Sequence, residues 1–137
     1  MLIAVSLKLY FDHARTLGYC RSVAALTAQF PELEGGTVDL AVLPSFLSIP
    51  GAAEVFAGTP VRLGAQDLSP FDRGPFTGEV SGTDLRDFGC SLVEVGHAER
   101  RRIFGEDDAM VASKVAAAVR NGLVPLLCVG EETPGDP

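Results

Sequence analysis

Cysteine is scarce in this sequence, and so is histidine. The three cysteines, Cys20, Cys90 and Cys128, are odd in number, lie far apart and form no CxxC pair. The sequence therefore indicates neither a disulfide framework nor a zinc site, and it favours a reduced, cytoplasmic setting. His13 and His97 are also far apart, so we expect no clustered metal site and no bound metal.

Basic residues are few as well. Eleven lysines and arginines stand against 18 aspartates and glutamates, which gives a formal net charge of −7. Proteins that grip nucleic acid do so through clustered Lys and Arg, so this balance argues against a nucleic-acid partner. The low number of basic residues is compatible with binding of one small phosphate group, which a few side chains can hold.

Long apolar runs are missing too. The sequence starts with MLIAVSLKLYFDHAR, in which the apolar run is too short to span a membrane. This segment also lacks the basic leader and the cleavage site of a signal peptide. We therefore expect no membrane partner and a cytoplasmic protein. With 47% hydrophobic and 21% charged residues, the 137 residues are typical of one soluble globular unit with a real core.

Several nucleotide and nucleophile motifs are absent. No GxGxxG or GxxxxGK[ST] follows the first apolar run, and GxSxG does not occur. An independent flavodoxin-like cofactor binder therefore has no phosphate loop to support it.

What the sequence does contain is a serial pattern of short apolar runs, near-continuous in Val, Leu and Ile. They cover residues 2–7, 38–43, 61–65, 91–95 and 124–129, and the segments between them have room for one helix each. Such runs are typical of parallel strands that are buried on both faces. We expect a βα repeat in an α/β sheet, which the spacing leaves open as a doubly wound sheet or a barrel.

Helix end signals support this alternation. Asp107 and Asp108 begin a helical pattern over 107–121 that stops at Asn121-Gly122. Ser81 and Asp84 resemble a capping box for a short helix that Gly89 could end. Residues 16–29, with Tyr19, Val23 and Leu26 on one face, and residues 50–58 are further helix predictions.

Polar residues follow the strands where either architecture would place its chemistry. Lys8 follows the first predicted strand, and His97 and Glu99 follow the fourth. A lysine, a histidine and a carboxylate at one edge suit charge stabilisation and proton transfer on an anionic small molecule.

These strand ends carry a family resemblance. GHAERRRIFGEDD (96–108) closely resembles GHSERRxxFGE of the triosephosphate isomerase family, and GPFTGEVSG (74–82) resembles that family's GAFTGEIS loop. AQD (65–67), CVGEE (128–132) and the lysine of SLKLY (6–10) also match in order. The resemblance implies a TIM (β/α)8 barrel, of which these residues are strands one to five.

The resemblance also implies a domain organisation. Family chains have roughly 250 residues in eight βα units, so residues 1–137 are expected to be the N-terminal part of a single barrel domain. Later units would carry the glutamate base on a lid loop and the phosphate-binding loops. Glu131 and Glu132 lie at the correct end of the sheet, but no family motif assigns the base to either.

The activity implied is isomerisation of dihydroxyacetone phosphate and glyceraldehyde 3-phosphate through an enediol, a step of glycolysis and gluconeogenesis, with no cofactor. His97 matches the electrophile, and the family is the best-known case of a neutral imidazole in that role. Lys8 matches the lysine that offers a cation to the phosphate and the enediolate. Glu99 matches a carboxylate that anchors this lysine, in a catalytic or a structural role. Ser6 and Lys8 would bind substrate.

The first strand departs from the family pattern. The family has NWKMN where this chain has SLKLY, so Ser6 replaces an asparagine that contacts the carbonyl region of the substrate. A serine is shorter and has no amide, and Ala98 replaces a serine beside the histidine. A tetrulose phosphate is therefore the second substrate candidate.

Other interpretations stay open for these residues. His97 could be a packed core histidine, Glu99 could pair with Arg100 or Arg101, and we expect Cys128 to be buried. Phe76, Thr77, Gly78 and Glu79 resemble the loop that enters the partner subunit of family homodimers, although an ordinary surface turn needs the same glycine. The chain could be completed by a C-terminal half-barrel, or it could be a catalytically incompetent half-barrel with a structural or binding role.

Overall fold

The computed structural model describes residues 1–130 of the chain, and the predicted alternation of strands and helices is confirmed there. The strands are β1 (Leu2–Ser6), β2 (Asp39–Leu43), β3 (Val61–Ala65), β4 (Leu92–Val95) and β5 (Val124–Leu127). The helices are α1 (His13–Thr27), α2 (Pro31–Glu34), α3 (Ile49–Phe56), α4 (Gly82–Asp87), α5 (Ala98–Phe104) and α6 (Asp108–Arg120), with a 3-10 turn at Phe46–Ser48.

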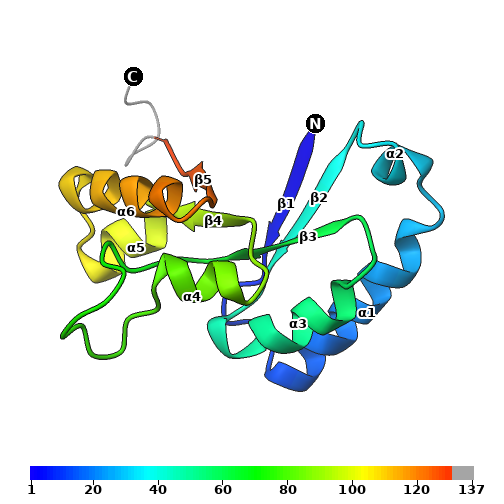
Figure 1. The fold of residues 1–137 in the computed structure, drawn as a ribbon, viewed down its shortest axis with the longest axis horizontal. Helices are drawn as coiled ribbons and strands as arrows, with labels where there is room; N and C mark the ends of the chain where they lie inside the picture. The colour runs from blue at the N-terminus through cyan, green and yellow to red at the C-terminus, as the bar shows by residue number, and fades with distance from the viewer. Residues whose placement is uncertain (131–137) are drawn as a thin grey trace.

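The strand order answers the question that the spacing left open. All pairs are parallel and the order is β1-β2-β3-β4-β5, so within the described residues the order never reverses. A doubly wound sheet has such a reversal at its ligand-binding crevice, whereas a barrel keeps sequential order. Figure 1 shows β1 and β2 on one side of a curved sheet and β4 and β5 on the other, with the helices around the outside. The described chain is thus half of a (β/α)8 barrel.

The two faces of the sheet bury different amounts of apolar surface. Alternate strand residues such as Val42, Leu63 and Val93 face the helices and belong to the larger core. The residues between them form a smaller cluster on the inner face, made of Ala41, Leu43, Leu92 and Leu126. The inner face therefore has its own packed layer, as a barrel interior requires.

Close packing of that inner layer requires a glycine on β3. A Cβ atom on Gly64 would lie 2.9 Å from Leu43 Cγ and 3.0 Å from Leu92 Cγ. Such contacts are too short, so a side chain here would push the neighbouring strands apart. Glycine at this position allows the sheet to bend tightly.

The predicted helices are confirmed with small boundary shifts, and two details differ. A separate helix, α5, begins at Ala98 and ends at Phe104, with Gly105 as its C-cap, so it does not continue into α6. The sequence analysis did not predict α2, a single turn that begins with Pro31. Leu26 is 49% exposed, whereas Tyr19 and Val23 pack on the core as expected.

The two outer strands have one neighbour each within the described residues. On β1, Leu2 and Ile3 are 40% and 45% exposed, and on β5 Val124 and Leu127 are 48% and 50% exposed. Among the described residues, no helix is both long and apolar enough to cross a membrane.

Candidate active site

The bend of the sheet brings the end of β1 to the end of β4, although two strands separate them. Lys8 Nζ lies 2.7 Å from His97 Nε2 and donates a hydrogen bond of 3.3 Å to Glu99 Oε2. All three side chains are partly exposed, with 28%, 24% and 45% of the side-chain surface accessible for Lys8, His97 and Glu99. The predicted site residues therefore form one cluster that is open to solvent.

The position of His97 at the start of α5 determines the role of its ring nitrogens. The backbone N–H of Glu99 donates to His97 Nδ1 at 3.1 Å, so His97 caps the helix with its own side chain. A neutral imidazole with Nδ1 as acceptor carries its proton on Nε2. The Lys8 ammonium can only donate, so at 2.7 Å it bonds to Nε2 when the neutral ring carries its proton on Nδ1, and the two contacts of the ring favour opposite tautomers. In the tautomer with its proton on Nε2, an oxygen placed between Nε2 and Nζ could accept from both as it gains negative charge.

Lys8 itself is held in an unusual backbone conformation. Among the described residues it is the sole non-glycine with a positive φ, at 52°. Gln66, at the end of β3, donates from Nε2 to the carbonyl oxygens of Lys8 at 3.2 Å and of Leu43 at 2.8 Å. Strained backbone persists where surrounding contacts impose it, and such positions gather at functional sites.

A second polar layer lies on the inner face, on the same side as this cluster. Ser6 Oγ donates to Glu94 Oε2 at 2.8 Å, and Cys128 Sγ lies 3.6 Å from Glu94 Oε1. Partial burial raises the pKa of the Cys128 thiol, and the Glu94 carboxylate raises it further. The expectation that Cys128 is buried is wrong, because the end of β5 is half-exposed within the described chain.

A buried ionic cluster lies behind the site and fixes α5 and α6 to the end of β3. Lys114, 3% exposed, donates to both carboxylate oxygens of Asp67 at 2.7 and 2.8 Å and to Glu106 Oε1 at 2.6 Å. Arg100 Nε lies 2.9 Å from Asp67 and 2.6 Å from Glu106. Glu106 Oε2 is buried without a hydrogen-bond partner.

The two carboxyl groups of this cluster respond to burial in different ways. Burial raises the pKa of Asp67 despite its hydrogen bond from Lys114. Burial also opposes ionisation of Glu106, but the hydrogen bonds from Lys114 and Arg100 outweigh it and lower the pKa.

The structure decides between the alternative partners of Glu99. Arg100 pairs with Asp67 and Glu106, and Arg101 Nη1 lies 2.7 Å from Asp108. The alternative in which Glu99 pairs with one of these arginines is therefore wrong, because α5 directs both of them toward the start of α6. His13 hydrogen-bonds to Ser48 at 3.0 Å, away from Lys8.

The loop between β3 and α4 projects away from the sheet (Figure 1). Phe76 stacks on Phe71 with ring centroids 4.0 Å apart, and Glu79 N–H donates to the Phe76 carbonyl at 3.1 Å. Thr77, Gly78 and Glu79 are exposed at the turn, where Gly78 has a φ of 88°. The predicted interface residues thus form a preformed, exposed turn.

Three residues that shape this region were not predicted from the sequence as site residues: Glu94, Gln66 and Lys114. A charged residue within the apolar run of β4 was the signal for Glu94, and a polar residue at a strand end was the signal for Gln66. Lys114 gave no signal, because a lysine in an amphipathic helix is normally solvated. Glu131 and Glu132 lie outside the described residues. Within residues 1–130, no group of three side chains could hold a metal ion.

Comparison with known proteins agrees with this geometry. Residues 1–135 match the family described as triosephosphate isomerase. The L-erythrulose-1-phosphate isomerase of Pectobacterium atrosepticum is 50% identical over 98% of this chain and 52% of its own length. The triosephosphate isomerase of Mycobacterium bovis is 42% identical over 95% of this chain and 49% of its own length. The chain spans about half the length of these curated relatives.

A solved structure shows the same fold. The crystal structure of triosephosphate isomerase from Bartonella henselae is 35% identical and superposes with a TM-score of 0.84, covering 95% of this chain and 52% of that one. Sequence and fold agree over nearly all of the chain, and we conclude that it belongs to the triosephosphate isomerase family.

Proposed function

We propose that the complete protein interconverts a short ketose phosphate and an aldose phosphate by proton transfer through an enediol(ate). The observation that carries this proposal is the convergence of Lys8 Nζ and His97 Nε2, 2.7 Å apart, at the open end of the sheet. Two donors directed at one region suit an oxygen that gains negative charge during the reaction. No cofactor or metal is needed for this chemistry.

The individual roles follow from the geometry. His97, as a neutral imidazole, donates from Nε2 to the carbonyl oxygen of the substrate. Lys8 adds a positive charge close to that oxygen and to the phosphate group. Glu99, 3.3 Å from Lys8, holds the ammonium in place and balances its charge. We assign Glu99 a positioning role in the reaction.

The proton acceptor is expected on a later part of the barrel. Family resemblance places a glutamate base on the lid loop after the sixth strand and the phosphate loops after the seventh and eighth. We propose that residues 1–137 are the N-terminal part of one barrel domain that such units complete, either on the same chain or as a partner half-barrel. The exposed apolar residues of β1 and β5 support this proposal.

Two substrates fit this chemistry. The triose phosphates, dihydroxyacetone phosphate and glyceraldehyde 3-phosphate, follow from family membership and would place the protein in glycolysis and gluconeogenesis in the cytoplasm. A tetrulose phosphate is the second candidate. It is favoured by Ser6 in place of the family asparagine and by the 50% identity to an L-erythrulose-1-phosphate isomerase.

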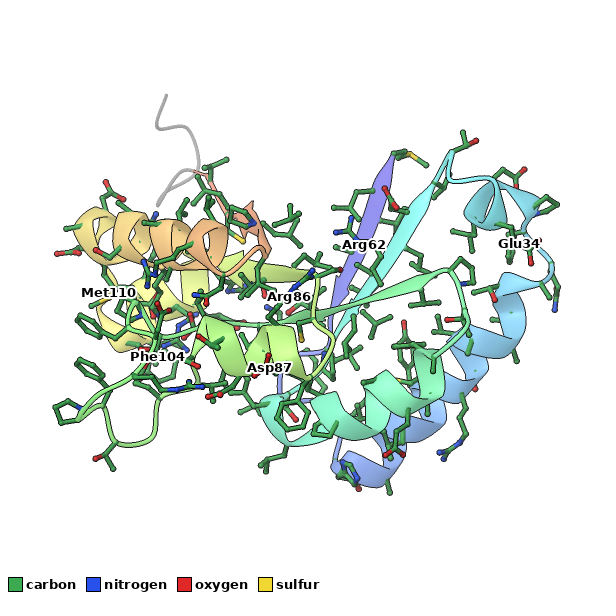
Figure 2. The ribbon with its side chains drawn as sticks, viewed as in Figure 1. Glu34, Arg62, Arg86, Asp87, Phe104 and Met110 are labelled. Carbon is green, nitrogen blue, oxygen red and sulfur yellow. The ribbon has the colours of Figure 1, made fainter. Side chains whose placement is uncertain are left out.

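We also propose that the complete protein forms a homodimer. The turn at residues 76–79 projects from the sheet with a rigid aromatic stack behind it. Ile103 and Phe104 of α5 are 61% and 66% exposed, and Figure 2 shows Phe104 and Met110 at the end of the molecule opposite α2. Apolar groups exposed together are typical of subunit interfaces.

A matched pair of histidine variants tests the proposed reaction. In the complete protein, we expect His97→Gln to lower kcat for ketose phosphate isomerisation by on the order of 10²- to 10³-fold, because one preorganised donor is lost. His13→Gln removes the other histidine, which bonds to Ser48, and should retain activity. Undiminished activity of His97→Gln would overturn the assignment.

A further inference from the structure

One hydrogen bond crosses the inner face of the sheet between strands that are not neighbours. Ser6 lies on β1 and Glu94 on β4, yet Ser6 Oγ donates to Glu94 Oε2 at 2.8 Å. Register places Ser6 beside Leu43 and Glu94 beside Leu126, and both of these leucines belong to the inner apolar cluster. Ser6 and Glu94 therefore face the interior of the barrel.

Glu94 is an unexpected residue for this position. Its neighbours on β4, namely Leu92, Val93 and Val95, are fully buried and apolar. Glu94 itself is half-buried on the inner face, and a carboxylate that loses part of its hydration is stabilised by a cation beside it. Within the described residues, the contacts of Glu94 are instead the hydroxyl of Ser6 and the thiol of Cys128.

These two contacts leave most of the hydrogen-bonding capacity free. An ionised carboxylate offers about four acceptor sites, and a serine hydroxyl that donates to it still has two lone pairs. The pair is thus rich in acceptors, whereas Lys8 and His97 just above it are donors. A ligand that complements the pair must bring its own donors, as a hydroxyl group does.

The pair lies directly beneath the proposed reaction centre. Ser6 is the last residue of β1, and Lys8 follows it in the turn at the open end of the sheet. A four-carbon ketose phosphate differs from the triose by one hydroxyl-bearing carbon at the end remote from the phosphate. Because serine is shorter than the family asparagine, it leaves space for that carbon.

We propose that Ser6 and Glu94 form a hydroxyl-binding pair that selects a four-carbon ketose phosphate over the three-carbon one. This inference rests on the proposed isomerase function and names the substrate of the same site. Glu94 accepts a hydrogen bond from the terminal hydroxyl of the substrate, and Ser6 orients the carboxylate. A half-buried carboxylate oxygen left unpaired by the shorter substrate disfavours that substrate.

The test compares both substrates in the complete protein. We expect the unmodified protein to prefer a tetrulose phosphate over dihydroxyacetone phosphate in kcat/KM. Glu94→Gln and Ser6→Ala should lower kcat/KM for the tetrulose phosphate by about 10- to 100-fold, as loss of a hydrogen bond to a charged group predicts. Ser6→Asn should shift the preference toward the triose. For Glu94→Gln and Ser6→Ala, the loss on dihydroxyacetone phosphate should be smaller than the loss on the tetrulose phosphate, so the ratio of the two kcat/KM values should fall.

Ser91→Ala is the matched control. It also removes a serine hydroxyl and a hydrogen bond, from Arg62 Nε at 3.1 Å, but at the opposite end of the sheet. We expect this variant to leave the ratio of the two kcat/KM values unchanged. Equal losses on both substrates in the Glu94 and Ser6 variants, or an unchanged ratio, would overturn the proposed selectivity while leaving the isomerase function intact.

A binding measurement separates failure of the inference from failure of the function. Calorimetry with two unreactive polyol phosphates, glycerol phosphate and a tetritol phosphate, reports selectivity without turnover. If the tetritol phosphate binds more tightly than glycerol phosphate, and Glu94→Gln abolishes this difference, the result would support selection by Ser6 and Glu94. This holds even if neither substrate is isomerised. Equal binding of the two would overturn it.

Discussion

At the residue scale, the site depends on two side chains that donate to the same region. Lys8 adopts a positive φ of 52°, which for a non-glycine residue costs about 1–3 kcal/mol, and Gln66 binds its carbonyl oxygen. His97 is fixed by the backbone N–H at the start of α5. Both side chains are therefore placed before a substrate binds, which is the condition for effective electrostatic stabilisation.

The first prediction concerns the tautomer of His97. Because the Glu99 N–H donates to Nδ1 at 3.1 Å, we expect the neutral ring to carry its proton on Nε2 when an oxygen of a bound sugar phosphate analogue lies between Nε2 and the Lys8 ammonium. Nitrogen NMR of labelled protein distinguishes the two tautomers and the imidazolium. A proton on Nδ1 would contradict the proposed geometry. The ring nitrogen signals of His13, which lies away from Lys8, serve as an internal reference for those of His97.

The second prediction concerns the reactivity of Cys128. Partial burial and the nearby Glu94 carboxylate raise the pKa of this thiol, so alkylation should require a higher pH than for a free cysteine. In Glu94→Gln the negative charge is lost, the pKa should fall, and the alkylation rate at mildly alkaline pH should rise. Mass spectrometry after timed alkylation measures this rate.

Cys90 provides the control for this experiment. Burial raises the pKa of its thiol to about 12 and blocks access, so Cys90 should stay unmodified in both proteins. A slower reaction of Cys128 in Glu94→Gln would show that the carboxylate does not disfavour the thiolate.

At the element scale, α6 packs on the core through Val111, Ala117 and Ala118, and one buried lysine joins it to the end of β3. Lys114 Nζ bonds to Asp67 at the end of β3 and to Glu106 just before the helix, while Arg100 joins the same carboxylates from α5. The cluster links α5, α6 and β3, so it also supports the segment that carries His97.

The third prediction tests this cluster. Lys114→Met removes the buried cation and leaves the Asp67 and Glu106 carboxylates with Arg100 alone, so we expect the free energy of unfolding to fall by about 3–5 kcal/mol. Arg120→Met, on the exposed side of the same helix, breaks the pair with Asp72 and should cost far less, because solvent screens an exposed ion pair. Denaturant unfolding of the complete protein and of both variants measures these changes in the free energy of unfolding. Equal decreases in the two variants would argue against a central role for Lys114.

At the scale of the whole molecule, the described chain is a curved sheet whose outer strands are not covered. Apolar side chains of β1 and β5 are exposed, and unpaired strand edges tend to associate with other chains. The inner cluster of four residues gives the inner face little apolar burial by itself.

The fourth prediction follows from this exposure. Residues 1–137 expressed alone should be poorly stable, bind hydrophobic dyes and associate. Co-expression with the C-terminal βα units of a full-length relative should raise the stability and reduce dye binding and association. Sedimentation and thermal unfolding measure the outcome, and a monomeric, cooperatively folded product from residues 1–137 alone would contradict the prediction.

Prediction from sequence worked best where the signal is local. The five strands follow from apolar runs, and Asp107 caps α6 as predicted, accepting from Met110 N–H at 2.8 Å. Lys8, His97 and Glu99 were identified because parallel strands end at one edge. Glu94 and Lys114 were missed because their significance depends on residues from other parts of the chain. Glu94 contacts Ser6 and Cys128. Lys114 pairs with Asp67 and Glu106.

The βα alternation, the family motifs and the residue types at the strand ends can be predicted from local sequence, because apolar period, capping residues and motif order are properties of neighbouring residues. Only the tertiary structure decided the sequential strand order, the contact of Lys8 with His97 and the bond from Ser6 to Glu94. These features depend on how far the sheet bends. That bend is set by packing among distant residues such as Gly64, Leu43 and Leu92, which no local pattern encodes.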